Sequence, residues 1–145
     1  MRAAAAEGFA RLKDPKDVPM LEKAWTDETK TAPRLSIAFA LVMHGKTELS
    51  EFSPLQFLIN NLNSASFNGV AYPFLVELAR DPSVRAALYV PLATATKDEK
   101  IGLARVLARS GDSGSVAPLE KLSKDPDPAV AQEGLKALRT LQSRM

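Results

Sequence analysis

Residues 116–141 read VAPLEKLSKDPDPAVAQEGLKALRTL, and this stretch decides the fold. It holds a short segment with an apolar stripe, an Asp-Pro-Asp-Pro turn and a longer striped segment, which predicts two helices joined by a tight turn. Residues 18–27, VPMLEKAWTD, repeat the opening of this stretch with Val, Leu, Glu, Lys and the final Asp in step. The two copies begin 98 residues apart, or three periods of roughly 32 to 33 residues, a length typical of stacked helical pairs. The sequence therefore predicts a helical repeat protein.

The composition is that of an ordinary globular chain of 145 residues, of which 46% are hydrophobic and 25% charged. The longest mainly apolar runs, residues 35–43 and 86–95, are about half of the roughly 20 residues that a membrane-spanning helix needs. We therefore expect a soluble protein. Because the chain has no cysteine, the sequence leaves both a cytoplasmic and a periplasmic location open.

Helix start and stop signals divide the chain into nine predicted helices, the first over residues 2–12, and no segment shows the period of two that predicts a strand. Gly45 and Gly111 are predicted to end helices, Pro73 to kink one, and Pro91 to distort one or end it early. Helix starts are predicted at residues of the N-cap type, most of them next to proline: Asp17, Ser53, Asp81, Thr96 or Asp98, and Asp127.

Nine helices give about four helical hairpins plus one terminal helix, in a single domain over residues 1–145 that could be a fragment of a longer array. Leu138 and Leu141 then lack a following repeat to cover them, so we expect self-association through exposed ends. Val70 and Leu135 are assigned to inward-facing stripes. The repeat-equivalent core positions are Leu21, Leu58, Leu107, Leu119 and Leu138.

The repeated pattern begins with an arginine, small residues and a closing Asp, and continues with a Val-x-x-Leu helix and an Asp-Pro turn. It resembles HEAT repeats of the short phycobilisome-lyase type. The residues that carry the resemblance are Arg2, Ala5, Ala6, Phe9, Leu12, Asp14, Val18, Leu21, Asp27, Gly111, Asp112, Val116, Leu119, Leu122, Asp125, Asp127, Pro128, Val130, Ala137, Leu138 and Leu141. The match is weak over residues 46–96. The resemblance implies an all-α, armadillo-like fold: an α-α superhelix that offers its second helices to partners.

The residues needed for common catalytic and metal sites are missing, because the chain has one histidine, His44, and no cysteine. Asp125 and Asp127 resemble a carboxylate pair, but a helix-linking turn with an N-cap explains both. We therefore predict no catalytic, metal or cofactor site. The net charge of +2 comes from interleaved charges rather than a basic patch, which makes nucleic-acid binding a minor alternative.

The favoured function is a non-enzymatic scaffold or protein-interaction module that binds another protein on the concave surface of its second helices. The alternative is a lyase-like HEAT protein acting on a chromophore-type ligand. Outward positions near the two ends carry Glu-Lys pairs, at residues 22–23 and 120–121, which we assign to a rim. The charge-poor middle carries an amide pair and an Arg-Tyr pair, residue types that suit an interface. These predicted partner-binding residues are Gln56, Asn60, Arg85 and Tyr89.

Overall fold

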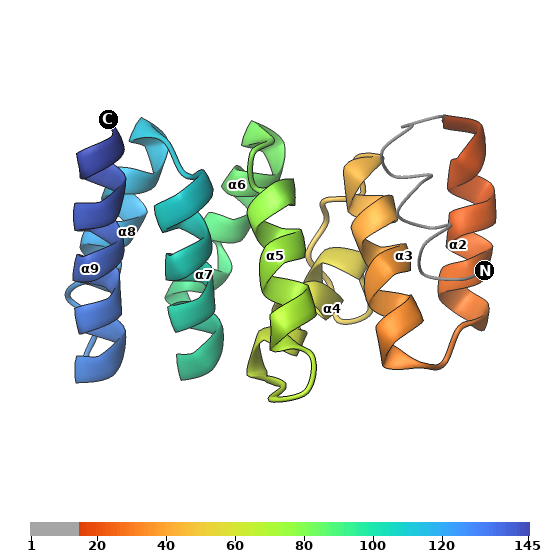
Figure 1. Cartoon of the computed structure of the whole chain (residues 1–145), viewed down its shortest axis with the longest axis horizontal. Helices are drawn as coiled ribbons and strands as arrows, with labels where there is room; N and C mark the ends of the chain where they lie inside the picture. Colours follow the sequence, from red (N-terminus) through yellow and green to blue (C-terminus); the bar gives the residue numbers. More distant parts are fainter. Residues whose placement is uncertain (1–14) are drawn as a thin grey trace. The chain divides into compact units, whose positions relative to one another are not determined.

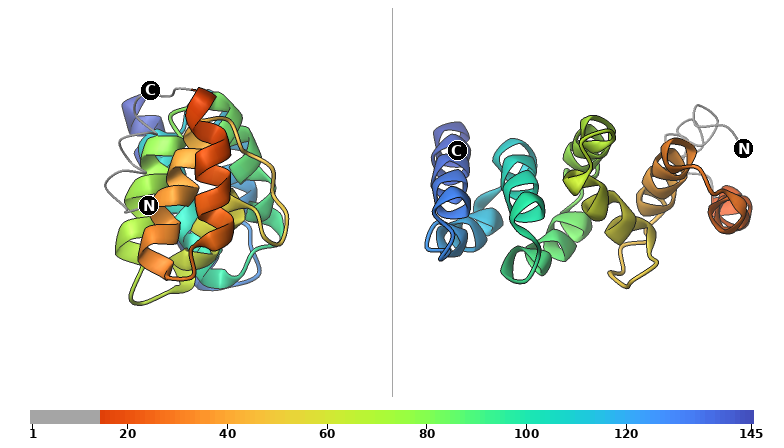
Figure 2. Two further views of the ribbon diagram at one scale, coloured as in Figure 1. Left: turned by 90° about the vertical axis from the view of Figure 1, so that its right-hand side faces the viewer. Right: turned by 90° about the horizontal axis from the view of Figure 1, so that it is seen from below.

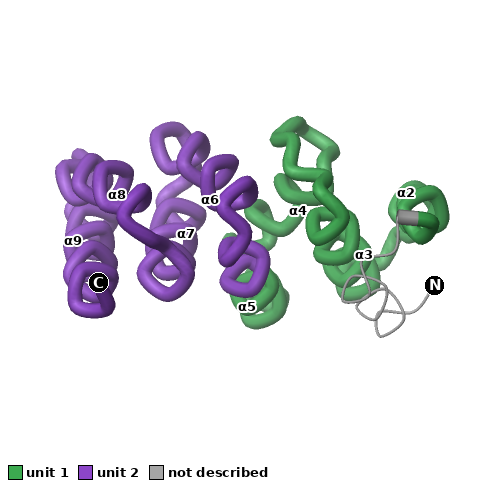
Figure 3. The backbone as a smooth tube through the Cα atoms, turned by 90° about the horizontal axis from the view of Figure 1, so that it is seen from above, with its two compact units in different colours: residues 1–74 green, residues 75–145 purple. Residues whose placement is uncertain are grey.

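A computed structural model describes residues 15–145, and every regular element in that range is helical (Figure 1). This confirms the all-α prediction for the described part of the chain. The predicted helix over residues 2–12 lies outside the described residues. The chain divides into two compact units, residues 1–74 and 75–145, with the boundary inside helix α5 (Asn68–Leu78) (Figure 3).

The first unit is built around a helix that is apolar on all sides. In α3 (Thr31–Met43) every residue from Leu35 to Val42 is buried, as expected when neighbours cover a helix all round. The Phe39 ring stacks on Phe74 of α5, with 4.5 Å between ring centroids. The other described elements of this unit are the 3-10 turn η1 (Pro15–Asp17), α2 (Val18–Asp27), α4 (Pro54–Asn60) and the 3-10 turn η2 (Asn61–Asn63).

Several helix ends in the first unit lie where the sequence predicts them. The Ser53 hydroxyl accepts a hydrogen bond from the Gln56 backbone N–H and caps α4. Gly45 follows α3 with φ of 99°, a backbone conformation that favours glycine. Asp17 departs from prediction: it takes the N-cap position of α2 but makes no side-chain cap, since it is already wound into η1.

In the second unit, the long helix α9 (Pro128–Arg144) packs against α7 (Lys97–Ser110) and α8 (Val116–Leu122), and Figure 2 shows α7 and α9 side by side. The remaining elements of this unit, after the end of α5, are α6 (Pro82–Tyr89) and the 3-10 turns η3 (Pro91–Ala93) and η4 (Ser113–Ser115).

The caps of the second unit also follow the sequence signals. The carboxylates of Asp81 and Asp127 accept hydrogen bonds from the backbone N–H groups of Ser83 and Ala129. Thr96, rather than the alternative Asp98, caps α7. The α6 helix ends at Tyr89, two residues before Pro91, so of the two predicted effects of this proline the early end is the one observed.

All five repeat-equivalent leucines are buried, but two other stripe positions are not. Val70 and Leu135 are 39% and 40% exposed. In α9 the buried stripe runs through Val130, Gly134 and Leu141, and Leu135 is turned about 100° from Gly134, away from this stripe. Nothing in the structure explains the exposure of Val70.

The C-terminal helix is covered, contrary to the expectation of an exposed end at Leu138 and Leu141. Both leucines are buried, because α9 packs on α7 as well as on α8. The Arg144 guanidinium donates two hydrogen bonds, of 3.1 and 2.7 Å, to the Ala108 carbonyl oxygen near the end of α7.

Candidate functional site

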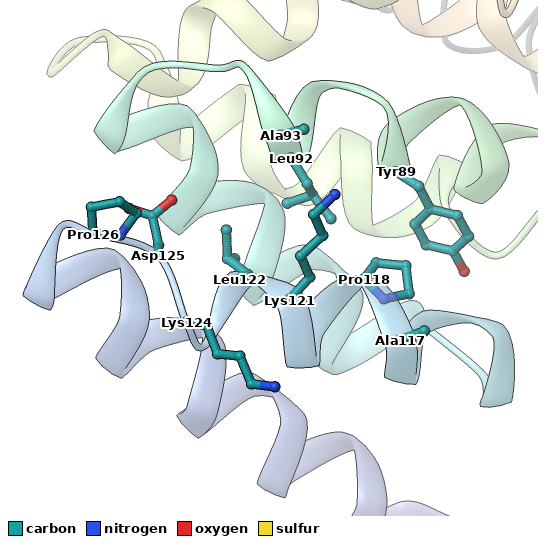
Figure 4. A pocket seen from close by; sticks show the side chains of 10 residues that line it. All are labelled: Tyr89, Leu92, Ala93, Ala117, Pro118, Lys121, Leu122, Lys124, Asp125 and Pro126. Atoms are coloured by element: carbon teal, nitrogen blue, oxygen red, sulfur yellow. The ribbon is translucent and has the colours of Figure 1, made fainter.

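A partly open groove of about 640 Å³ lies in the second unit, between the end of α6 with η3 on one side and α8 on the other (Figure 4). Its surface is mainly apolar. The lining residues are Tyr89, Leu92, Ala93, Ala117, Pro118, Lys121, Leu122, Lys124, Asp125 and Pro126.

Two prolines shape the groove. Pro91 has no backbone N–H, so α6 stops at Tyr89 and the chain turns through η3, which brings Leu92 and Ala93 to one wall. Pro118 lies in the first turn of α8, where the helix has no acceptor for the missing N–H, and contributes to the opposite wall. The groove therefore lies between two short helical segments.

The positive charge of the groove comes from two lysines on the α8 side. In Figure 4 the Lys121 side chain extends across toward Leu92 and Ala93, whereas Lys124 lies at the edge and points away from the centre. No ion pair between described residues engages either ammonium group.

Asp125 also lines the groove, but its carboxylate already has partners. One oxygen accepts a hydrogen bond from Lys100 Nζ at 2.8 Å, and the other accepts one from the Asp127 backbone N–H at 2.9 Å. These bonds, led by that from Lys100, lower the pKa of Asp125 below its ordinary value. Asp125 therefore stays ionised and paired, and the unpaired charge beside the apolar walls is positive.

Tyr89 is the one predicted partner-binding residue that lines the groove. Its hydroxyl group shares a 2.7 Å hydrogen bond with the Ser115 hydroxyl, which also accepts a hydrogen bond from the Asp112 backbone N–H in the capping box of η4. This bond orients the ring.

Arg85 does not point outward as predicted. Its side chain is only 11% exposed, and it donates hydrogen bonds of 2.9, 2.9 and 2.8 Å to the carbonyl oxygens of Ala79 and Arg80 and to the Asp112 carboxylate. The physical reason is that Ala79 and Arg80 lie in the turn just after α5, where carbonyl groups at the C-terminal end of a helix lack helical partners and attract a cation. Arg85 is a structural residue of the second unit.

Gln56 and Asn60 lie in the first unit, on α4, and the Gln56 amide nitrogen donates a 2.8 Å hydrogen bond to the Asn60 side-chain oxygen. Asn60 is exposed and Gln56 is half-buried. The structure therefore brings these two amides together on one helix face.

Most groove residues were missed at the sequence level. Lys121 was assigned to the rim, and the structure places it in the lining, whereas its neighbour Glu120 is exposed and outside the groove. Leu92, Ala93, Ala117 and Pro118 carried no site prediction. The only sequence signal was that Pro91 ends a helix and is followed by an apolar pair.

Within residues 15–145, no cluster of His, Asp or Glu has the arrangement of a metal site, and no helix is long and apolar enough to cross a membrane. No protein-family model, no curated protein and no solved structure matches the chain.

Proposed function

We propose that this chain is a non-enzymatic protein-interaction module of HEAT-like helical hairpins, and that its groove binds an apolar, acidic segment of a partner protein. The observation that carries the proposal is the groove itself, an apolar surface over which Lys121 extends without an ion-pair partner among the described residues. Exposed apolar surface of this kind marks interaction sites, and the lysine favours a partner segment that carries carboxylates.

The polar groups of the groove favour a protein segment over a small molecule or a reaction. A small-molecule site needs several polar groups that converge on the ligand. Here the Tyr89 hydroxyl is bonded to Ser115 and the Asp125 carboxylate to Lys100, which leaves apolar walls and lysine ammonium groups for a ligand. Broad apolar contact with a charged edge is how proteins recognise each other.

A substitution on the α8 wall tests this proposal. Ala117 is exposed and lines the groove, so Ala117→Glu places a charge among the apolar walls on a residue type that keeps helices stable. Ala86→Glu is the matched control, because Ala86 is exposed on α6 and does not line the groove. Both variants should keep the far-ultraviolet circular dichroism spectrum of the wild type.

The probe is a random peptide library displayed on phage and selected on the immobilised wild-type protein. We expect enriched peptides to combine apolar or aromatic residues with Asp or Glu. Their affinity, measured by fluorescence anisotropy, should fall at least about tenfold on Ala117→Glu and stay unchanged on Ala86→Glu. Peptides that bind both variants equally, or a selection that enriches nothing, would contradict the proposal.

A further inference from the structure

The loop between α3 and α4 presents an aromatic ring to solvent. Phe52 is 80% exposed, the most exposed large apolar residue in the described part of the chain. The Ser53 backbone N–H donates a 3.1 Å hydrogen bond to the Ser50 carbonyl oxygen, which closes a β-turn with Glu51 and Phe52 at its tip. The turn therefore holds this ring away from the first unit.

The geometry of that turn is reinforced by the cap of α4. The Ser53 hydroxyl donates to the Ser50 carbonyl oxygen at 3.0 Å and accepts from the Ser50 backbone N–H at 3.2 Å. It also accepts from the Gln56 backbone N–H in the cap. Because one side chain serves both the turn and the helix, Phe52 is displayed from a defined loop, and little conformational entropy is lost when such a loop binds.

The turn is acidic as well as aromatic. Glu48 and Glu51 are exposed, and no ion pair between described residues engages either carboxylate. The segment Glu48–Phe52, ELSEF, thus matches the apolar, acidic chemistry of the proposed groove ligand, with Leu49 half-buried between the two acidic residues.

We propose that the groove binds the Glu48–Phe52 segment of a second copy of this chain. The proposal rests on the proposed function of the groove and names its occupant. Phe52 of one molecule supplies the aromatic ring for the apolar walls of the other, and Glu51 supplies a carboxylate for Lys121. Two different surfaces meet, so the contact is heterologous, and it forms rings if it closes and open chains if it does not.

The turn complements the groove both in apolar surface and in charge, and this is the argument for a second copy. The groove has apolar walls and lysines without an ion-pair partner among residues 15–145, and the turn has an exposed ring and carboxylates that likewise lack such a partner in this range. Opposite charges around an apolar contact both steer association and select the partner. This route to self-association differs from the one expected through the chain ends, where Leu138 and Leu141 are buried.

Sedimentation velocity of the whole chain, from micromolar to millimolar concentration, tests the proposal. Wild type should self-associate, and Phe52→Ser should weaken the association at least about tenfold. Leu135→Ser is the matched control, because Leu135 is another exposed large apolar residue that takes no part in the contact. It should associate as wild type does.

Charge reversal gives a test in which the informative result is the recovery of association, not only its loss. Variant one carries Glu48→Lys and Glu51→Lys, and variant two carries Lys121→Glu and Lys124→Glu. Each should fail to associate alone, because its turn and groove then have the same sign. A mixture should associate again, because each turn then meets a groove of opposite charge. Association of either variant alone at wild-type strength would overturn the proposal.

A labelled peptide covering residues 47–53, TELSEFS, separates failure of this inference from failure of the proposed function. The peptide should bind wild type and lose at least about tenfold in affinity on Ala117→Glu. If wild type stays monomeric, or if the peptide does not bind while library peptides do, the second-copy occupant is wrong and the groove proposal stands. If no peptide of either kind binds, both proposals are wrong.

Discussion

Arg85 lies where three acceptors meet, and these bonds hold its side chain within the second unit. It joins the turn after α5 to the N-cap of η4 through the Ala79 and Arg80 carbonyl oxygens and the Asp112 carboxylate. Because Asp112 is half exposed, the ion pair itself contributes little, and most of the stabilisation comes from the two carbonyl bonds.

Arg85→Met keeps the apolar part of the side chain and removes these bonds. We expect the free energy of unfolding to fall by about 1–3 kcal/mol, because hydrogen bonds from a charged group are lost in a nearly buried place. Urea denaturation measures the change. Arg80→Met, on an exposed arginine, should stay within about 0.5 kcal/mol of wild type, and an equal loss there would contradict the assignment.

Gly134 allows the close approach of α9 to the end of α8. A Cβ atom at this position would lie 2.9 Å from the Leu122 carbonyl carbon and 2.9 Å from the Ser123 backbone nitrogen. Both are backbone atoms, so they cannot move aside as a flexible side chain could.

Gly134→Ala should therefore destabilise the protein by about 1–3 kcal/mol, although alanine is the better helix former by about 1 kcal/mol. Gly69→Ala is the control in α5, where a Cβ atom would meet nothing within 4 Å. We expect it to leave stability unchanged or to raise it by up to about 1 kcal/mol. Thermal unfolding of the two variants measures the difference in stability, and a Gly134→Ala variant that is more stable than wild type would contradict the close α8–α9 contact.

At the scale of elements, the helix boundaries followed from the sequence because their signals are local. Ser53, Asp81 and Asp127 each cap the helix that directly follows them. Pro91 acts on the helix just before it, α6. The groove could not be predicted in this way, because it depends on how η3 and α8 approach each other. Gly134 shows the same limit: a hydrophobic stripe favours Leu135, whereas the contact needs the residue without a side chain.

The ion pair between Lys100 and Asp125 connects α7 to the turn between α8 and α9. Both side chains are mostly buried, and the pKa of Asp125 is lowered, chiefly by the hydrogen bond from Lys100. A carboxyl whose pKa is lower in the folded state stabilises that state at pH values above its ordinary pKa of about 3.9. This contribution is lost as pH falls through the folded-state pKa.

Asp125→Asn should consequently lower the urea midpoint at pH 7, since it removes the carboxylate from Lys100. The difference in urea midpoint between variant and wild type should narrow as pH falls below about 4, because the protonated wild-type carboxyl then resembles the amide. Glu120→Gln, on an exposed residue of α8, should show no such difference. A difference that stays constant down to about pH 2 would show that the ion pair is not its cause.

For the molecule as a whole, the two units carry surfaces of opposite character. The first unit displays an acidic turn with an exposed ring, and the second contains an apolar groove with positive charge. The sequence shows a charge-poor middle, and the partner-binding residues predicted from it lie on α4 and α6. Gln56 and Asn60 are bonded to each other, Arg85 is buried, and Tyr89 alone of these four lines the groove.

The bond between Arg144 and the Ala108 carbonyl oxygen has a consequence for local opening of the second unit. The last turn of a helix ordinarily frays, so its amide protons exchange with solvent almost freely. Here that turn is attached to α7, 36 residues earlier in the chain. Amide protons at the end of α9 should therefore exchange slowly and together with those at the end of α7. Arg144→Met should speed exchange at both ends, and hydrogen-exchange mass spectrometry would record the end of α9 and the end of α7 opening as one unit.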